Sequence, residues 1–261
     1  GDDELKQKAE RILYVFNNKG IQQLSAFREK EFEAKIQELE DYKKYNEEEL
    51  LKKDEQIWKL KEENDKIKQK SIIDQSIPID VNNPDVDDII FTDIDGTRKK
   101  ISKKLNKSNT IPITNVLDEG VYAIEVEFFN THSGCAAIGI VRDSYDIPAN
   151  TNPKESPHRD HIAFYGGKAF GGSVQHKGSK IAGNIGFGDN QVIRAELDTS
   201  KGRLTFFAGG IQVPFCVDNV NETVRFVIYM EHPDSYCIIW SLKKFAKPSA
   251  VLLANRLSVS W

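Results

Sequence analysis

The chain has 261 residues, of which 39% are hydrophobic and 29% are charged, and its formal net charge is −4 at pH 7. A charge this small gives no bulk field that would draw the protein to nucleic acid or to anionic lipid, and no stretch approaches the ~20 apolar residues of a membrane-spanning helix. The acidic first residues lack the apolar core of a signal peptide, so we expect a cytoplasmic protein that does not bind nucleic acid and for which membrane binding is not favoured.

Residues 1–76 are predicted to form a long helix. They contain no proline and one internal glycine, Gly20, and they are rich in the helix formers Glu, Lys and Gln. The segment Asn17–Gly20 interrupts the apolar spacing of the first turns. Gly20 therefore either ends a first helix or lies inside a continuous one at a cost of ~1 kcal/mol.

From Phe32 onward this helix carries a seven-residue repeat of apolar side chains, which is typical of a coiled coil. A lone helix of ~70 residues would be ~100 Å long and would expose that stripe. We therefore predict a homodimer, with a single solvated helix held by Glu–Lys pairs as the alternative. The residues predicted to form the dimer contact are Phe32, Ile36, Leu39, Leu50, Ile57, Leu60 and Ile67.

Composition changes near residue 76, where Pro78 and the segment Asn82–Pro84 break any helix. We place a linker at residues 77–85 and a second domain at residues 86–261. Many short strands with almost no helical pattern predict a β-sandwich or barrel for this domain. Alternation of apolar and polar residues predicts strands at 121–129, 137–141, 192–197, 203–207, 224–230, 237–242 and 252–259.

Three stretches of the second domain resemble the SPRY domain family. Residues 119–127 (EGVYAIEVE) resemble the opening strand of the family, and residues 137–141 (AIGIV) resemble the next strand. Residues 188–198 (GDNQVIRAELD) and 201–207 (KGRLTFF) resemble its most recognisable stretch. The resemblance covers roughly residues 86–261, and it implies an antiparallel β-sandwich of two sheets whose end loops bind a protein or peptide ligand.

A coiled coil directly before such a domain resembles the C-terminal half of tripartite-motif proteins. By that resemblance the helices of the dimer run antiparallel, and each chain presents a SPRY-like domain. The B-box and RING domains of those proteins have no counterpart in residues 1–76, which contain no Cys or His. Ubiquitin-ligase activity is therefore not implied for this chain, and we predict a scaffold or recognition module that is not an enzyme.

The segment Asp93-Ile-Asp95-Gly-Thr97 offers an alternative function. It matches the motif of haloacid-dehalogenase-like phosphotransferases, in which the first Asp is the nucleophile and the second is a general acid, with Mg²⁺ between them. That chemistry needs a sheet of alternating strands and helices, whereas the residues that follow are predicted to be all-β. We therefore expect a strand that ends in an Asp-Gly turn.

Other chemical groups give weaker signals. The cysteines, Cys135, Cys216 and Cys237, are odd in number and lack a Cys-x-x-Cys pair, so we expect reduced, mostly buried thiols and no zinc site. His158 and His161 have no clustered third ligand, and we predict neither a metal nor a cofactor. The basic stretch 98–107 is expected to be a solvated strand or loop, with contact to a membrane surface as a further alternative.

The ligand surface is predicted in three loops. The longest, residues 142–160, is the main candidate because a structureless loop of this length is usually functional or disordered. Glycines in residues 165–172 would let Phe170 stand out, and residues 130–134 form the third loop. A core position is the alternative for the two aromatic residues of the second loop. The predicted ligand-binding residues are His132, Tyr145, Asn150, His158, Arg159, Tyr165 and Phe170.

Overall fold

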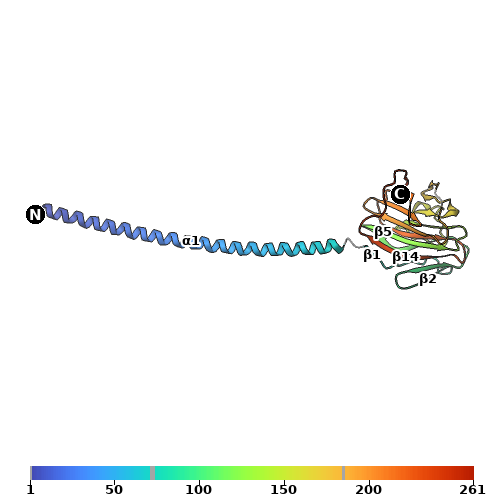
Figure 1. Cartoon of the computed structure of the whole chain (residues 1–261), viewed down its shortest axis with the longest axis horizontal. Coiled ribbons are helices and arrows are strands. Elements are labelled where there is room, and N and C mark those ends of the chain that lie inside the picture. The colour runs from blue at the N-terminus through green and yellow to red at the C-terminus, as the bar shows by residue number, and fades with distance from the viewer. Residues whose placement is uncertain (1, 71–73, 184–185) are drawn as a thin grey trace. The chain divides into compact units, whose positions relative to one another are not determined.

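The computed structural model describes residues 2–70, 74–183 and 186–261, without the side chains of residues 24–27 and 63–70. The chain divides into two compact units, Gly1–Lys68 and Gln69–Trp261 (Figure 1). No helix among the described residues is both long and apolar enough to span a membrane.

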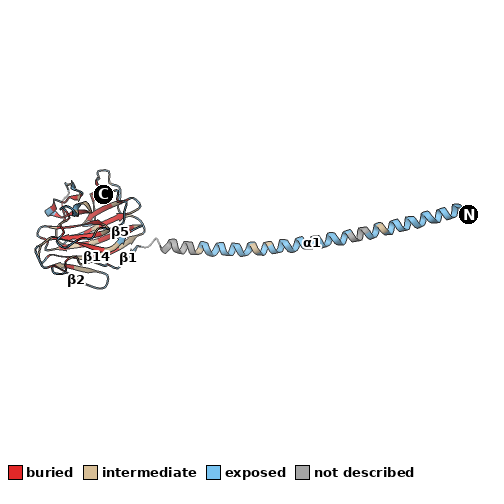
Figure 2. Cartoon of the chain, turned by 180° about the vertical axis from the view of Figure 1, so that it is seen from behind, coloured by how far each residue is buried: buried red, intermediate tan, exposed pale blue. Residues whose placement is uncertain are grey.

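The first unit is one uninterrupted helix, α1 (Asp2–Lys70), so the predicted long helix is confirmed and the break considered near Gly20 is absent. Three acidic residues in its first turn suit the positive end of the helix dipole. Exposed i,i+3 and i,i+4 ion pairs such as Lys35–Glu38 and Lys59–Glu55 add a few tenths of a kcal/mol each, roughly. Nearly all of the helix residues whose side chains are described are exposed in this single chain (Figure 2).

The heptad side chains of α1 that the structure describes have no covering partner in the single chain. The described members of the predicted dimer contact are between 49% and 72% exposed, namely Phe32, Ile36, Leu39, Leu50, Ile57 and Leu60. The side chain of Ile67, the seventh member, lies outside the described ones. The apolar stripe predicted from the sequence is therefore exposed along the described part of α1.

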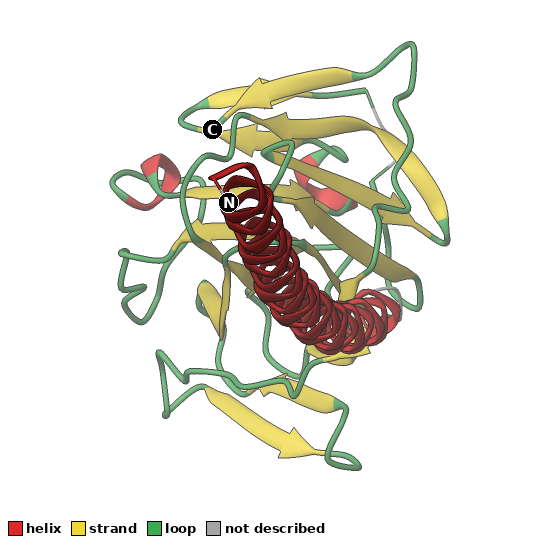
Figure 3. Cartoon of the chain, turned by 90° about the vertical axis from the view of Figure 1, so that its left-hand side faces the viewer, coloured by secondary structure: helices red, strands yellow, loops and turns green. Residues whose placement is uncertain are grey.

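From residue 74 on, the described part of the second unit consists of strands, loops and two short 3₁₀ helices (Figure 3). One sheet has the order β15 (Leu257–Ser260), β12 (Ile211–Asp218), β11 (Arg203–Ala208), β10 (Val192–Asp198), β5 (Val121–Phe129), β14 (Tyr236–Phe245), β3 (Lys99–Lys103) and β2 (Ile89–Asp93), and β1 (Gln75–Ser76) also pairs with β14. The other has the order β4 (Asn109–Leu117), β13 (Val224–Met230), β6 (Ala136–Arg142), β7 (Ile162–Gly166), β8 (Val174–His176) and β9 (Ser179–Ile181). Among these strands only β12 and β15 pair in parallel, so the predicted antiparallel two-sheet sandwich is confirmed with one parallel pair.

Alternating side chains of the two sheets form the main core. On β5, Ile124, Val126 and Phe128 belong to the same fully buried cluster as Ile138 of β6 and Phe226 of β13. A second, smaller cluster contains residues of opposite parity from the six-stranded sheet, including Ala137, Val141 and Val227. Because successive strand residues point to opposite faces, this second cluster lies on the outer face of that sheet.

The expected linker at residues 77–85 is instead part of the second unit, which is a correction to the predicted boundary. The Ile77 N–H donates to the Leu242 carbonyl at 2.8 Å, and Val81 forms a bridge with Ile113 of β4. Ile79 is 5% exposed and packs in the main core. The last described helical residue is Lys70, eight positions before Pro78. The apolar residues between Pro78 and Pro84 bury too much surface to remain a free tether.

A buried polar network joins the two sheets near β3 and β4. The Lys103 ammonium contacts the Asp88 carboxylate, and both side chains are 0% exposed. Asn109 donates to Asp88 at 2.6 Å and to Asp85 at 3.1 Å. Burial acts to raise the pKa of Asp88, but hydrogen bonds from Lys103, the Leu105 N–H and Asn109 lower it below its usual value. Burial lowers the pKa of Lys103.

The last residue also connects the sheets. The Trp261 ring stacks on His176 of β8 with ring centroids 4.6 Å apart, and its N–H group Nε1 donates to Glu222 at 2.7 Å. Its backbone N–H donates to the Asp218 carbonyl at the end of β12. The residue that follows β15 is thereby bonded to the end of β12 and stacked on β8.

Candidate functional site

The connection between β6 and β7, residues 143–161, lies against the outer face of the six-stranded sheet. Ile147 is buried in the second apolar cluster. The Asn150 N–H donates to Asn109 Oδ1 at 2.9 Å, and the Thr110 hydroxyl donates to the Thr151 carbonyl at 2.9 Å. This connection is therefore fixed to the sheet at its middle and is not a structureless end loop.

Tyr145, His158 and His161 form an aromatic cluster where this connection meets β7, and we call it the Tyr145 cluster. Tyr145 Oη lies 2.7 Å from His158 Nδ1, and the Tyr145 ring stacks on His161 at 4.0 Å between centroids. Arg225 of β13 donates to the carbonyls of Asp143 and Tyr145, which holds the backbone in place. Burial raises the pKa of Tyr145 and lowers that of His158, so both act as neutral hydrogen-bonding groups near pH 7.

Two further predicted ligand-binding residues are exposed on the same connection. Arg159 lies in the 3₁₀ helix η1 (His158–Asp160), and its guanidinium is 3.9 Å from the Asp160 carboxylate. Asn150 adopts a positive φ of 59° and its side chain is exposed. Arg159 is next to the Tyr145 cluster in sequence, whereas Asn150 marks the fixed middle of the connection.

Tyr165 and Phe170 do not belong to the exposed surface, and the core position is the one that the structure shows. Tyr165 is 0% exposed in the main core, and Phe170, in the 3₁₀ helix η2 (Lys168–Phe170), is 6% exposed. The Phe170 ring packs edge-on against Tyr229 at 5.7 Å between centroids, and the Lys154 ammonium lies 4.8 Å above it. Residues 143–161 cover the face from which Phe170 was expected to project.

His132 is exposed but belongs to a different part of the surface. Its turn is held by Asp189, whose carboxylate accepts the Thr131 N–H at 3.0 Å. Gly134 completes the turn with a φ of 78°, where a side chain would collide with the Phe187 carbonyl. The His132 ring stacks on His232, 4.5 Å between centroids, and not on the Tyr145 cluster.

The Asp93–Thr97 motif forms the turn between β2 and β3, as expected for a strand that ends in an Asp-Gly turn. Asp93 accepts the Gly96 N–H at 2.5 Å, and Gly96 has a φ of 79°. Asp95 accepts from Thr97 and from the Arg98 side chain at 2.7 Å. Hydrogen bonds from Arg98 and Thr97 lower the pKa of Asp95. The two carboxylates are thus engaged in closing an antiparallel hairpin.

The basic stretch 98–107 is largely neutralised within the fold. Arg98 pairs with Asp95, Lys99 with Asp93, Lys103 with Asp88 and Lys107 with Asp85. The Lys100 ammonium lies 4.0 Å from the centre of the Tyr236 ring. These pairings leave little of the stretch available as a basic patch for lipid.

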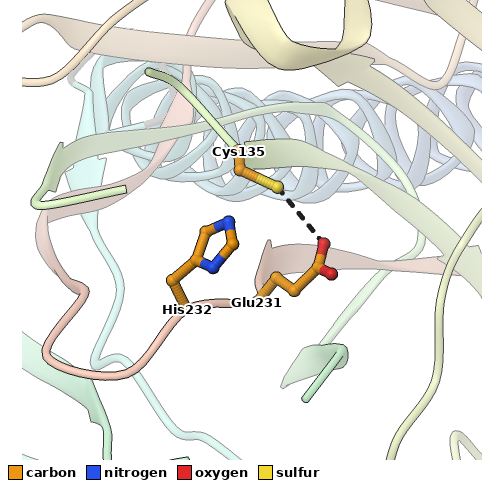
Figure 4. Close-up of side chains that lie close together, drawn as sticks. All are labelled: Cys135, Glu231 and His232. Carbon is orange, nitrogen blue, oxygen red and sulfur yellow. Dashed lines mark hydrogen bonds between the residues drawn. The ribbon is translucent and has the colours of Figure 1, made fainter. Parts of the chain in front are cut away.

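One cluster was missed by the sequence reasoning. Cys135, Glu231 and His232, which we call the Cys135 cluster, place one ligand-type atom each within 4.8 Å of one another (Figure 4). The Cys135 thiol donates to Glu231 at 3.2 Å. Burial and this carboxylate raise the pKa of Cys135 to about 12. Only the pairing of β6 with β13, which brings Ala136 opposite Met230, reveals that the neighbouring residues meet.

Part of the second unit matches a known protein family. A family model described as "SPRY domain" matches residues 121–242. No curated protein matches the chain. Similar solved structures are the TRIM65 PSpry domain (10% identity, 62% of this chain and 92% of that chain, TM-score 0.49), the SPRY domain of human HERC1 (13%, 59% and 95%, 0.45) and a human SPRY domain (14%, 58% and 93%, 0.43). Because these TM-scores are below 0.5, the assignment rests on the family model.

Proposed function

Because residues 121–242 carry a SPRY domain, a protein-interaction fold that is not typically catalytic, we propose that this protein is a self-associating recognition module. In this proposal α1 pairs with a second copy to form a coiled-coil homodimer, and each SPRY domain binds a protein or peptide ligand. The arrangement parallels that of tripartite-motif proteins. The three free cysteines, two of them buried, are consistent with a cytoplasmic location.

The recognition surface is proposed at the Tyr145 cluster together with Arg159. Tyrosine and arginine are favoured at binding hot spots because they combine a large contact area with hydrogen bonding. His158 adds a neutral imidazole beside the Tyr145 hydroxyl, and the Arg225 hydrogen bonds hold the Tyr145 backbone before any ligand arrives. Such preorganisation reduces the entropy lost on binding.

This surface can be tested with a random peptide library displayed on phage and selected on the full chain. Clones that bind the wild type should lose at least about tenfold in affinity for Arg159→Glu, as expected for a hot-spot side chain. Lys247→Glu makes the same charge change at another exposed residue and should leave binding unchanged. Selected peptides that bind both variants equally would place the recognition surface elsewhere.

Self-association is proposed because α1 exposes apolar side chains at heptad spacing. Leu39 is 59% exposed and Leu60 is 65% exposed in the single chain, and both lie at the d position of the repeat that begins at Phe32. Pairing two helices would bury both stripes, and each Leu buried is worth roughly 1.5–3 kcal/mol. Two such chains would also bind a multivalent ligand with avidity.

The measurement is sedimentation equilibrium of the full chain at micromolar concentration. The wild type should sediment as a dimer and the double variant Leu39→Asp/Leu60→Asp as a monomer. Leu51→Asp is the matched control, because Leu51 is equally exposed (69%) on the same helix but outside the a and d positions. A monomeric wild type, or a Leu51→Asp variant that dissociates as fully as the double variant, would reject the heptad contact.

A further inference from the structure

The Cys135 cluster is built by the register of two neighbouring strands. Ala136 of β6 pairs with Met230 of β13 in antiparallel register. Cys135 directly precedes the first residue and Glu231 directly follows the second, so the pairing places them opposite each other at the strand ends. Side chains that face each other in this way have Cβ atoms about 4.5–5.5 Å apart. The start of β6 and the end of β13, which lie side by side, therefore position the cluster.

The side chains of the cluster converge from two loops. Cys135 ends the turn that begins at Thr131, whose carbonyl accepts the Cys135 N–H at 2.9 Å. Glu231 and His232 begin the connection from β13 to β14. A ring nitrogen of His232 faces the Cys135 sulfur, and Glu231 approaches from the third side (Figure 4). All three residues are half-buried.

Neighbouring groups orient the cluster as they would orient metal ligands. His232 Nδ1 donates to Asn106 Oδ1 at 3.2 Å, which leaves Nε2 as the ring nitrogen free of that bond. The Glu231 carboxylate accepts the Tyr229 hydroxyl at 2.8 Å, and Tyr229 is in turn bonded to Ser108. Hydrogen bonds of this kind fix the tautomer of a ligating imidazole and the position of a ligating carboxylate.

We propose that Cys135, Glu231 and His232 bind a Zn²⁺ ion that clamps the turn at residues 131–135 to the connection after β13. Sulfur, imidazole nitrogen and carboxylate oxygen are the three ligand types of protein zinc sites, and three protein ligands leave a fourth position for water. The soft thiolate selects against Mg²⁺ and Ca²⁺. Binding requires the thiol proton that now lies toward Glu231 to be released to solvent as the Zn–S bond forms.

Titration of the full, chelator-treated chain with Co²⁺ tests this site. The wild type should bind one Co²⁺ with a thiolate-to-metal charge-transfer band, which one equivalent of Zn²⁺ abolishes and excess Mg²⁺ does not. Cys135→Ser and His232→Gln should lose the band. The matched controls Cys216→Ser and His158→Gln, which alter a cysteine and a histidine outside the cluster, should keep it. Absence of the band in the wild type, or its persistence in Cys135→Ser, would overturn the proposal.

A second measurement does not depend on how the ligand variants fold. Asn106 is exposed and touches only the far nitrogen of His232 in the cluster. Asn106→Ala should weaken Zn²⁺ binding about 10–100-fold, the usual effect of removing a hydrogen-bond partner of a ligand. In the wild type, Zn²⁺ should also protect Cys135, but not Cys216, from alkylation as read by peptide mass spectrometry. Equal alkylation of Cys135 with and without Zn²⁺ would overturn the proposal independently.

Discussion

The helix and the sandwich bury their apolar side chains in different ways. Ile138 and Phe226 of the sandwich are 0% exposed, whereas Leu39 and Leu60 of α1 are more than half exposed. The sandwich is therefore stabilised within one chain, because its two sheets cover each other. The helix has no such cover, and most helical stability in proteins comes from packing of an apolar face. Substitutions should accordingly act on stability in one unit and on association in the other.

Breaking the buried ion pair should give the largest change. Lys103→Met leaves the Asp88 carboxylate buried without its cation, which costs about 3–5 kcal/mol in similar cases. We expect a loss of this size in the free energy of unfolding measured in urea, with unchanged self-association. Lys104→Met, at the exposed neighbour, serves as the control. A loss below about 1 kcal/mol is the usual effect of an ordinary substitution. Such a loss would show that the pair does not contribute to stability beyond an average side chain.

The segment before β2 should behave as core and not as linker. Ile79→Ala removes a side chain that packs in the main cluster and should lower the free energy of unfolding by about 2–4 kcal/mol. Val86→Ala, at a residue that is 72% exposed, should change it by less than about 0.5 kcal/mol. If urea titrations gave equal losses for the two substitutions, residues 77–85 would be a linker and not part of the core.

Asp218 should make the sandwich sensitive to acid. Burial acts to raise its pKa, but hydrogen bonds from Arg203 at 2.7 Å and Arg256 at 2.5 Å lower it below the usual value. A carboxyl whose pKa is lower in the folded state stabilises the fold above its unfolded pKa of about 3.9 and loses that contribution as pH falls through the folded value.

Asp218→Asn should therefore be about 1–3 kcal/mol less stable than the wild type at pH 7, and the difference should shrink steadily below pH ~4. Urea unfolding of both proteins across this range measures it. For Asp146→Asn, at an exposed position, the free energy of unfolding should change with pH in the same way as that of the wild type. A difference between Asp218→Asn and the wild type that is constant with pH would argue against the carboxylate as its cause.

The smallest expected effects come from replacing one glycine by alanine in each unit. Gly20→Ala should stabilise α1 by about 1 kcal/mol, because a Cβ there meets no atom within 4 Å. Gly139→Ala should instead destabilise the sandwich, since its Cβ would collide with the Ala163 carbonyl of β7. Thermal melting of the helical circular dichroism signal and urea unfolding measure the two effects. If both substitutions stabilised the protein, or both destabilised it, this expectation would be wrong.

The strands that the sequence revealed are those with regular alternation, and the missed ones have a physical reason. Buried and more exposed residues alternate in β5 from Ile124 to Phe129 and in β10 from Val192 to Ala195. Proline interrupts the alternation in β4 (Pro112) and in β12 (Pro214), and the pairing of each strand with its neighbour shifts register. Proline is tolerated in sheets at such irregular positions. The first five residues of β4 are also buried on both faces, which hides the period.

The candidate sites were less predictable because they depend on how loops and strands meet. Tyr145 and His158 were both expected at the ligand surface, but their hydrogen bond follows from the path of residues 143–161 across the sheet. The same path buries Phe170, which glycine-rich flanks had suggested would project. Cys135 and Glu231 are 96 residues apart, and only the register of β6 against β13 brings them together.

The stack of Trp261 on His176 means that tryptophan fluorescence can report on the end of β15. The chain has three tryptophans: Trp58 is on the helix, Trp240 donates to Glu127 within the nine-stranded sheet, and Trp261 ends the chain after β15. Intrinsic emission therefore carries signals from both units, and replacing Trp58 by Phe isolates the sandwich. Detachment of β15 from β12 would then hydrate the terminal indole and shift its emission to longer wavelength before the remaining strands separate.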